Sequence, residues 1–415
     1  MRTGSADIVQ RLDTALGGRA VPVCVLIGAC LLAYSSSPFN GDDHAIVLDN
    51  PLVNGEGRLI DVFTTPYLDV MYRPLTILSF AAQRFVFGTG PWSFHLVNVL
   101  LHVLMTVLVW RLVRTVAGVG PTAALSAGLL FAVHTIHTDA VSAVVGRSDI
   151  LAGVFVVGSF LAWRAWCTGG RFMTLAGAGA FFLMGLLCKE SAAPLLVFGA
   201  LWALHHYWAD RRASERRSGS RGLGVMAAGW TIAGIIPFAG YLLARNMILG
   251  GHLVSAKNAY FSMVDASDTF LTMLGVAARY IGLLLFPSPL SPDYTWESIP
   301  LEHSILGFWP LAGLFLLAVV SVAMIVLLTR RTEGARAAGL GLLWLMVFMA
   351  PASNVIPLMI PMAERMTYIA SAGLCLAAAV GLDLALKRAA VPVLVGALLY
   401  LIVLTGMTAD RDRVW

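Results

Sequence analysis

Charged residues are scarce in this chain of 415 residues. Lys, Arg, Asp and Glu together make up 12% of it, about half the share in a soluble globular protein, whereas hydrophobic residues make up 58%. A chain this apolar cannot cover its surface in water, so its solvent must be lipid. The composition therefore excludes a soluble protein and predicts an integral membrane protein with many spans.

Lysine is also scarce, and the cysteines show no metal-binding spacing. Lysine occurs only at Lys189, Lys257 and Lys387, so 25 of the 28 basic residues are arginines. These basic residues cluster at the ends of apolar segments, which is the orientation signal of a membrane protein and no indication of a nucleic-acid partner. The five cysteines lie in or beside apolar segments without Cys-x-x-Cys or Cys/His spacing, so neither a zinc site nor a disulfide framework is expected.

Long apolar runs are the main feature that is present. A helix needs about 20 apolar residues to cross the hydrocarbon core of a membrane. The candidate segments are 20–37, 94–117, 121–137, 149–166, 172–188, 191–208, 223–245, 269–286, 306–329, 338–352, 364–386 and 391–409. Segment 269–286 is ambiguous, because Arg279 lies in its middle and Pro287 and Pro289 follow its end.

The basic loops resolve the ambiguity of segment 269–286. If the basic loops are cytoplasmic, an even number of crossings must separate loop 211–221 from loop 330–336. Segments 223–245 and 306–329 supply two, so segment 269–286 is predicted to be re-entrant or to lie at the outer interface. The sequence thus predicts an all-α polytopic protein with about eleven spans, the N-terminus inside and the C-terminus outside, and one transmembrane domain over 1–415.

The polar residues then lie mostly on the outer face, above all in loops at about 38–93 and 246–305. Ionisable residues at the membrane edge are costly unless they are paired or functional. The first such site is Asp42-Asp43, just beyond the first span. Two adjacent carboxylates repel each other, which suits one of them to act as a general base; a solvated helix cap is the alternative.

Three further outer sites carry ionisable side chains. His134, His137 and Asp139 have the residue types of a metal site, but zinc helices favour His-x-x-x-His, so a metal is possible and not expected. Arg147 and Asp149 follow, either as an interfacial ion pair or with the arginine on a lipid phosphate. The remaining two sites are Lys189-Glu190 and Glu364-Arg365. For these, structural pairing and function both stay open, but together the outer sites predict that one polar cavity is lined.

Eight blocks in these regions resemble a known family. The blocks are Asp42-Asp43-His44-Ala45-Ile46, Tyr72-Arg73-Pro74-Leu75-Thr76, 94–102, 134–141, 145–151, 187–190, 351–354 and 363–369. Their order and spacing resemble the TMTC proteins, the transmembrane O-mannosyltransferases that target cadherins, and their bacterial relatives. The resemblance extends from about residue 35 to the end of the chain. Any one block is weak evidence, but eight in order are specific.

The resemblance implies a glycosyltransferase of the GT-C fold. Family members transfer mannose from polyprenyl-phosphate mannose to Ser or Thr hydroxyls of exported proteins. Because a monophosphate donor needs less charge neutralisation than a diphosphate, no metal is expected to be required. The base of GT-C enzymes maps onto Asp42 or Asp43, of which Asp42 is favoured. Asp139 stands where the family commonly has Glu and is the third catalytic candidate. The family also carries tetratricopeptide repeats after the last span, and this sequence shows none.

The chemistry of the leaving group places the other outer residues at the donor. A phosphate leaving group needs cations placed around it in advance. The residues expected at the donor phosphate or substrate are Arg73, His134, His137, Arg147, Asp149, Lys189, Glu190, Glu364 and Arg365. Attack by a deprotonated acceptor should invert the anomeric centre. The expected location is the bacterial inner or plasma membrane, with the active site on the outer face.

Two other functions compete with protein O-mannosylation. A transporter or flippase for lipid-linked sugars would also carry intramembrane charges, but more often with inverted repeats and interrupted helices. The large outer loop with adjacent acids favours the enzyme. A GT-C transferase with a lipid or polysaccharide acceptor is the closer alternative, since the sequence does not distinguish acceptors.

Overall fold

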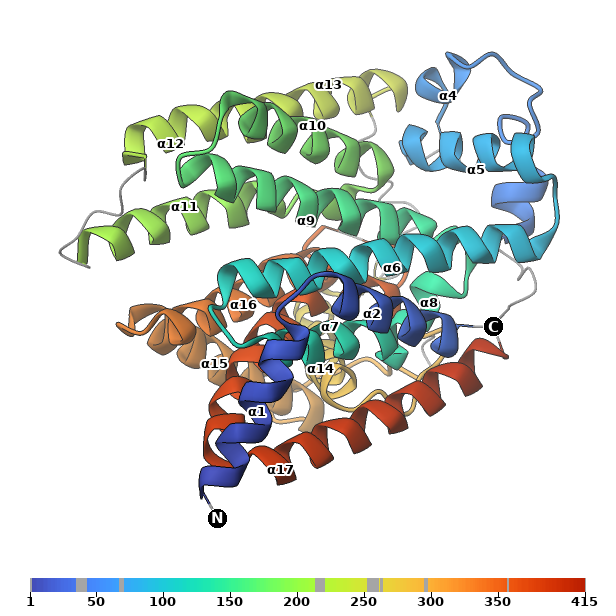
Figure 1. The fold of residues 1–415 in the computed structure, drawn as a ribbon. Helices are drawn as coiled ribbons and strands as arrows, with labels where there is room; N and C mark the ends of the chain where they lie inside the picture. Colours follow the sequence, from blue (N-terminus) through green and yellow to red (C-terminus); the bar gives the residue numbers. More distant parts are fainter. Residues whose placement is uncertain are drawn as a thin grey trace.

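The computed structural model describes residues 2–34, 43–66, 71–212, 221–251, 261, 264–294, 298–356 and 358–414. Within these ranges the chain forms helices joined by turns and loops, and no β-sheet (Figure 1). The helices are α1 (Arg2–Leu16), α2 (Ala20–Ala33), α4 (Asp61–Thr64), α5 (Pro74–Phe87), α6 (Pro91–Val116), α7 (Pro121–Val133), α8 (Thr138–Val141), α9 (Arg147–Cys167), α10 (Phe172–Cys188), α11 (Leu195–Arg212), α12 (Leu223–Trp230), α13 (Ile236–Ile248), α14 (Ala266–Leu285), α15 (Phe308–Thr329), α16 (Glu333–Met349) and α17 (Ser371–Asp412). The all-α prediction is confirmed.

Several of these helices can cross a membrane. In the described residues seven are long and apolar enough, and nine if each of two bent helix pairs counts as one span. Helix α10 is apolar but shorter, with 17 residues. The polytopic prediction is therefore confirmed, whereas the count of eleven spans stays a prediction.

Helix α17 contains two of the predicted spans. Its 42 residues are interrupted at Ala389, which has non-helical angles (φ −150°, ψ 71°), three residues before Pro392. Both ends of α17 contact the C-terminal end of α7 and the turn after it. Ser371 bonds to His137 at 2.9 Å, and Thr408 donates to the carbonyl of Val133 at 2.8 Å. Figure 1 shows the chain turning back near the α17 label.

Proline marks the start of three consecutive helices, α5, α6 and α7. Pro74, Pro91 and Pro121 each occupy the first helical position of α5, α6 and α7. Proline is favoured there because its ring presets φ and its missing N–H would have had no partner. The local sequence therefore predicts where these helices begin.

Helix α14 contains the ambiguous segment 269–286. Near its start, Thr272 accepts a hydrogen bond at 3.0 Å from the backbone N–H of Glu302, just before α15. Near its end, the carbonyl of Leu284 bonds to His134 and the hydroxyl of Tyr280 bonds to Ala363. By length and composition α14 could span a membrane. That α14 does not cross therefore stays a prediction.

Cysteine labelling tests the placement of α14. Ser267 in the first turn of α14 and Ser298 beyond its end are exposed, and Thr332 is exposed between α15 and α16. In a variant without native cysteines, Ser267→Cys and Ser298→Cys are expected to label from the same side with a membrane-impermeant maleimide. Thr332→Cys should label only from the other side. Labelling of the first two from opposite sides would show that α14 is a further crossing.

Two glycines bring α16 and α17 into close contact. A Cβ atom added at Gly373 would meet the backbone oxygen of Gly341, and one added at Gly341 would meet the backbone of α17. Small residues at such crossings let membrane helices approach until their backbones touch. This contact holds the α17 half that follows Glu364-Arg365 against α16.

Gly373→Ala is expected to destabilise the protein by about 1–3 kcal/mol, because the added methyl group has no space between the two backbones. Gly381→Ala in the same helix is the matched control, since an added Cβ there meets nothing within 4 Å. The control should be neutral or more stable by up to about 1 kcal/mol, the gain in helix propensity. Thermal unfolding in detergent measures both; equal melting temperatures would contradict close packing at Gly373.

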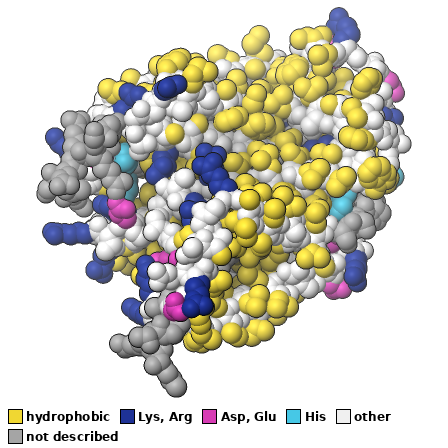
Figure 2. Space-filling model, in the orientation of Figure 1, with side chains coloured by type: hydrophobic (Ala, Val, Ile, Leu, Met, Phe, Trp, Pro, Cys, Tyr) yellow, Lys and Arg dark blue, Asp and Glu magenta, His cyan; other side chains and the backbone are white. Residues whose placement is uncertain are grey.

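The surface of the molecule matches a lipid environment. Figure 2 shows hydrophobic side chains over much of the visible face, with Lys and Arg more frequent on the left of the view, where α9 and α11 end. Helix α15 exposes large side chains such as Phe315 (67%) and Val322 (60%). Together with its helices, this surface identifies a multi-pass integral membrane protein.

Candidate active site

Polar side chains gather where helices break at the end of the bundle that holds the C-terminus in Figure 1. Helix α7 ends before His134, Lys189 is extended between α10 and a 3-10 turn, and a second 3-10 turn begins at Glu364. Broken helices free backbone groups and make room for side chains between spans. The ion pairs at these breaks form what we call the ion-pair cluster: Arg73, Asp139, Asp149, Lys189, Glu190, Arg245, Glu364, Arg365 and Arg411.

One largely buried pair of this cluster joins Lys189 to Asp149. The Lys189 ammonium donates to Asp149 Oδ2 at 2.6 Å, and the two side chains are 13% and 3% exposed. Burial lowers the pKa of Lys189, with the charges of Arg73 and Arg365 adding to the effect and Asp149 opposing it.

Glu190 binds two arginines beside it. The guanidinium of Arg73 donates to both carboxylate oxygens, at 2.6 and 3.2 Å, and that of Arg245 lies 4.0 Å away. Burial raises the pKa of Glu190, but Arg73 and Lys189 outweigh it and hold that pKa below its usual range. Lys189 and Glu190 thus face different partners, as expected for adjacent residues.

Asp139 binds Arg365 with both carboxylate oxygens. Oδ1 accepts from the Arg365 guanidinium at 3.0 Å and Oδ2 from the Arg365 backbone N–H at 2.9 Å. Arg365 is 29% exposed, the highest value among the five cations of the cluster. Of the predicted donor residues it is the cation most open to a ligand.

Glu364 is the least exposed carboxylate of the cluster. Its buried carboxylate accepts from the Arg411 guanidinium at 2.8 Å, from the Tyr294 hydroxyl at 2.7 Å and from the backbone N–H of Ser291 at 2.9 Å. Burial raises the pKa of Glu364 to about 7, although Arg411 and the hydrogen bond from Tyr294 lower it and Asp139 raises it further. Glu364 can therefore change its charge near neutral pH.

A raised pKa means that folded Glu364 holds its proton up to a higher pH than the unfolded chain does. Its contribution to stability is therefore expected to fall as the pH rises from about 4.5 to about 7. In Glu364→Gln that dependence should be absent, so the difference in melting temperature between wild type and variant should change across this window. Melting curves at a series of pH values measure it; parallel curves would show that Glu364 does not titrate there.

Sequence reasoning missed three members of this region: Arg245, Arg411 and Tyr294. A signal existed for Arg245, which ends the predicted span 223–245 on the outer side, where arginine is disfavoured. Arg411 belongs to the basic end of the chain, and its partner lies 47 residues earlier. No local pattern marks Tyr294.

Of the two adjacent acids in the first loop, Asp42 and Asp43, the structure describes only Asp43. Asp42 lies outside the described residues. Asp43 is fully buried, and its Oδ1 accepts a hydrogen bond from the backbone N–H of Val145 at 2.9 Å. This bond ties the first loop to the turn before α9, which gives Asp43 a positioning role.

Arg147 was expected at the donor phosphate, and the structure engages it elsewhere. Its buried guanidinium donates to Asn98 Oδ1 at 2.8 Å and to the carbonyl of Phe94 at 3.0 Å, and it stacks 4.5 Å from the centre of the Phe80 ring. These partners belong to α5 and α6. These contacts join α5 and α6 to the start of α9, and the role of Arg147 at the donor phosphate stays a prediction.

His134 and His137 are likewise buried structural groups. His134 Nε2 lies 3.0 Å from the carbonyl of Leu284, and His137 Nδ1 lies 2.9 Å from that of Phe131. Their second ring nitrogens contact the N–H of Ile136 and the hydroxyl of Ser371. The described residues contain no group of three or more His, Cys, Asp or Glu side chains that could hold a metal ion. The histidines satisfy the backbone at the break of α7.

The sequence of the chain is similar to those of protein mannosyltransferases. A family profile described as dolichyl-phosphate-mannose-protein mannosyltransferase matches residues 74–228. Identity to the protein O-mannosyl-transferase Tmtc3 of Drosophila melanogaster is 28% over 88% of this chain and 46% of that protein. Identity to TMTC1 of Homo sapiens is 29%, over 94% of this chain and 49% of that one. The chain thus spans about half the length of these curated relatives.

Among solved structures, ArnT from Cupriavidus metallidurans bound to undecaprenyl phosphate matches with a TM-score of 0.48 and 17% identity. The match covers 88% of this chain and 60% of ArnT.

A helical multi-pass chain whose sequence matches this profile over residues 74–228 resembles the membrane glycosyltransferases. More particularly, it is a relative of the TMTC protein O-mannosyltransferases. The resemblance to the TMTC family predicted from the sequence is thereby confirmed, and the GT-C fold stays a prediction.

Proposed function

We propose that this chain is an inverting glycosyltransferase that transfers mannose, or a similar hexose, from a polyprenyl-phosphate donor to Ser and Thr hydroxyls of exported proteins. One observation carries the proposal: Arg73, Lys189 and Arg365, from distant parts of the sequence, gather at one end of the helix bundle. A lipid-linked sugar phosphate places its reactive carbon at the membrane–water interface, where this end of the bundle would lie. The names of the relatives supply the sugar and the acceptor.

The ion-pair cluster suits a phosphate leaving group. It holds five cations against four carboxylates, so its net charge is positive even with every carboxylate ionised. The carboxylates keep the cations charged and oriented before the donor arrives, which is the preorganisation that stabilises developing charge. We assign the first contact with the donor phosphate to Arg365, with Lys189 and Arg73 behind it.

We assign the general base to Asp42. Asp43 already binds the backbone of Val145, and Asp139 binds Arg365, so each has a structural partner in the resting protein. In the proposed step the acceptor hydroxyl attacks the anomeric carbon and gives its proton to the Asp42 carboxylate. The bond from that carbon to the phosphate oxygen breaks, and polyprenyl phosphate leaves with the electron pair. No step in this scheme requires a metal ion.

The topology completes the proposal. The cluster lies on the outer face of the plasma membrane, the transferase portion is a single transmembrane domain over 1–415, and the basic end of the bundle faces the cytoplasm.

Transfer by the purified protein tests the function. The chain in lipid nanodiscs is incubated with radiolabelled polyprenyl-phosphate mannose and with Ser/Thr peptides, lipid acceptors or no acceptor. We expect label in peptides and stoichiometric release of polyprenyl phosphate. Label in lipid acceptors alone would replace the acceptor class. Donor movement across a vesicle membrane without release of sugar would replace the enzyme with a flippase.

A further inference from the structure

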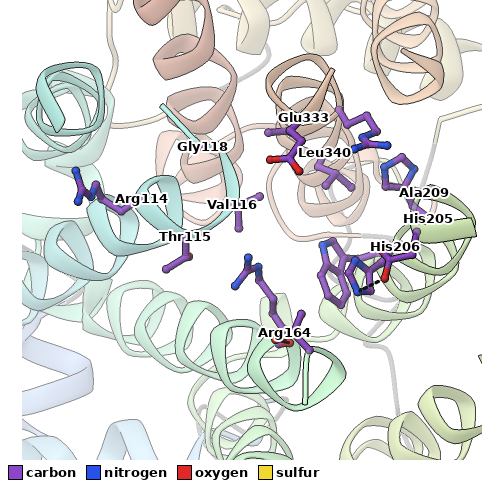
Figure 3. Close-up of a pocket in the computed structure, with 15 residues that line it drawn as sticks. Arg114, Thr115, Val116, Gly118, Arg164, His205, His206, Ala209, Glu333 and Leu340 are labelled. Atoms are coloured by element: carbon purple, nitrogen blue, oxygen red, sulfur yellow. Dashed lines mark hydrogen bonds and ion pairs between the residues drawn. The ribbon is translucent and has the colours of Figure 1, made fainter. Parts of the chain in front are cut away.

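A cavity of about 220 Å³ lies at the other end of the bundle from the ion-pair cluster (Figure 3). It is lined from α6, α9, α11 and α16, and Arg114 and Arg164 come from the last turns of α6 and α9. Asp149 of the ion-pair cluster and Arg164 are 15 residues apart on α9, which is about 22 Å. The cavity, which we call the arginine cavity, is therefore separate from the candidate active site.

Positive charge prevails in the arginine cavity. Three arginines, Arg114, Arg164 and Arg336, line it with two carboxylates, Asp210 and Glu333. Within the described residues, the side chains of Arg114 and Arg336 make no ion pair or hydrogen bond. Figure 3 shows Arg164 reaching from α9 into the space between Val116 and His206. All three arginines are half-buried, so an anion between them would be partly shielded from water.

Two histidines extend this basic lining. His205 and His206 belong to α11 and line the same cavity. His206 lies 3.6 Å from Asp210 and stacks on the buried ring of Trp202, with the ring centres 5.0 Å apart. Protonation of either imidazole would add to the positive charge.

The floor of the cavity is apolar, with Trp202, Val116 and Leu340 among its lining residues. Cations above an apolar floor fit an amphipathic group, a phosphate ester, better than a bare ion. The volume is below the roughly 300 Å³ at which pockets enclose a whole small molecule. It can hold a headgroup whose remaining atoms lie outside.

The surroundings indicate where those remaining atoms would lie. Helix α11 exposes Leu204 (42%) and Trp208 (51%), next to the cavity residues His205 and Ala209. This end of the bundle also holds the basic loops that the topology places in the cytoplasm. Anionic lipids of the cytoplasmic leaflet favour such basic pockets between spans.

We propose that the arginine cavity binds the phosphate headgroup of an anionic phospholipid from the inner leaflet, with its acyl chains along the exposed face of α11. The bound lipid would join α6, α9, α11 and α16 at the end remote from the ion-pair cluster. A free phosphate ion shares the chemistry but not the apolar part.

The test compares two pairs of substitutions that remove equal charge from the same end. Arg164→Gln with Arg336→Gln changes the cavity, whereas Arg330→Gln with Arg331→Gln changes two exposed residues outside it. Native mass spectrometry of detergent-solubilised protein measures binding of phosphatidylglycerol, phosphatidylcholine and inorganic phosphate. We expect wild type and control to retain phosphatidylglycerol in preference to phosphatidylcholine. The cavity variant should bind it about tenfold more weakly or worse, as for loss of one charge-assisted hydrogen bond or more.

Several results would overturn the proposal. Equal loss of phosphatidylglycerol in both variants would show general surface attraction. Equal binding of phosphatidylcholine would show that the headgroup charge is not read. Competition by millimolar inorganic phosphate as strong as by the lipid would show a site for a free anion. If the glutamine pair does not fold, Arg164→Lys with Arg336→Lys replaces it, because lysine keeps charge without the two-pronged contact. Unchanged binding in that variant would count against the site.

Discussion

Asp42→Asn is expected to lower the rate of sugar transfer by about 10²- to 10⁴-fold, the usual contribution of a positioned general base. Asparagine keeps the size of the side chain but cannot take the proton of the acceptor. Binding of the polyprenyl-phosphate donor should change little, because the donor phosphate contacts the cations. Single-turnover transfer and donor binding, measured on the same preparation, separate the two quantities.

Asp43→Asn is the matched control for this prediction. Its carboxylate is buried and accepts the N–H of Val145, and an asparagine oxygen can accept the same bond. The substitution also removes the negative charge that faces the buried Arg147, so we expect a lower melting temperature together with transfer that persists in the folded fraction. The opposite pattern, with Asp42→Asn active and Asp43→Asn folded but inactive, would move the base to Asp43. If both variants stay active, Asp139 is the next candidate.

The second large effect is expected at Lys189. Lys189→Gln leaves Asp149, which is 3% exposed, without its ionic partner. Breaking one side of a buried ion pair typically costs about 3–5 kcal/mol, because the remaining charge loses its compensation. In this proposal the same change also removes a cation from the donor phosphate. We expect both a lower melting temperature and weaker donor binding.

A double variant separates these two effects. Asp149→Asn together with Lys189→Gln removes both charges, so much of the lost stability should return. Donor binding should stay weak, because the phosphate still lacks the ammonium. Recovery of both stability and donor binding would show that Lys189 serves only the fold, and the phosphate assignment would then rest on Arg365 and Arg73.

The ends of several helices were predictable because their signals are local. Proline at Pro74, Pro91 and Pro121 opens three helices. The predicted segment 172–188 coincides with α10, since an apolar run between Arg171 and Lys189 has clear ends. The candidate site residues Arg73, Asp139, Asp149, Lys189, Glu190, Glu364 and Arg365 were also recognisable, because charged side chains beside apolar runs stand out against a sequence with few charges.

The partners of these residues were not predictable. Asp139 and Arg365 are 226 residues apart, and Arg73 and Glu190 are 117 apart. A sequence without aligned relatives shows which charges exist at the membrane edge, but not which two meet. Arg147 illustrates the limit, since its charge suggested a phosphate ligand, whereas its contacts with α6 could not be read from the sequence.

The sequence by itself determined the class of the protein. Few charges and many apolar runs leave lipid as the only solvent, and in lipid the backbone must satisfy its own hydrogen bonds, which favours helices. The tertiary structure decided which polar residues became an electrostatic cluster and which became part of the frame. That decision depends on the packing of helices from distant parts of the chain, because a charge between spans keeps its form only beside a partner that the fold brings to it.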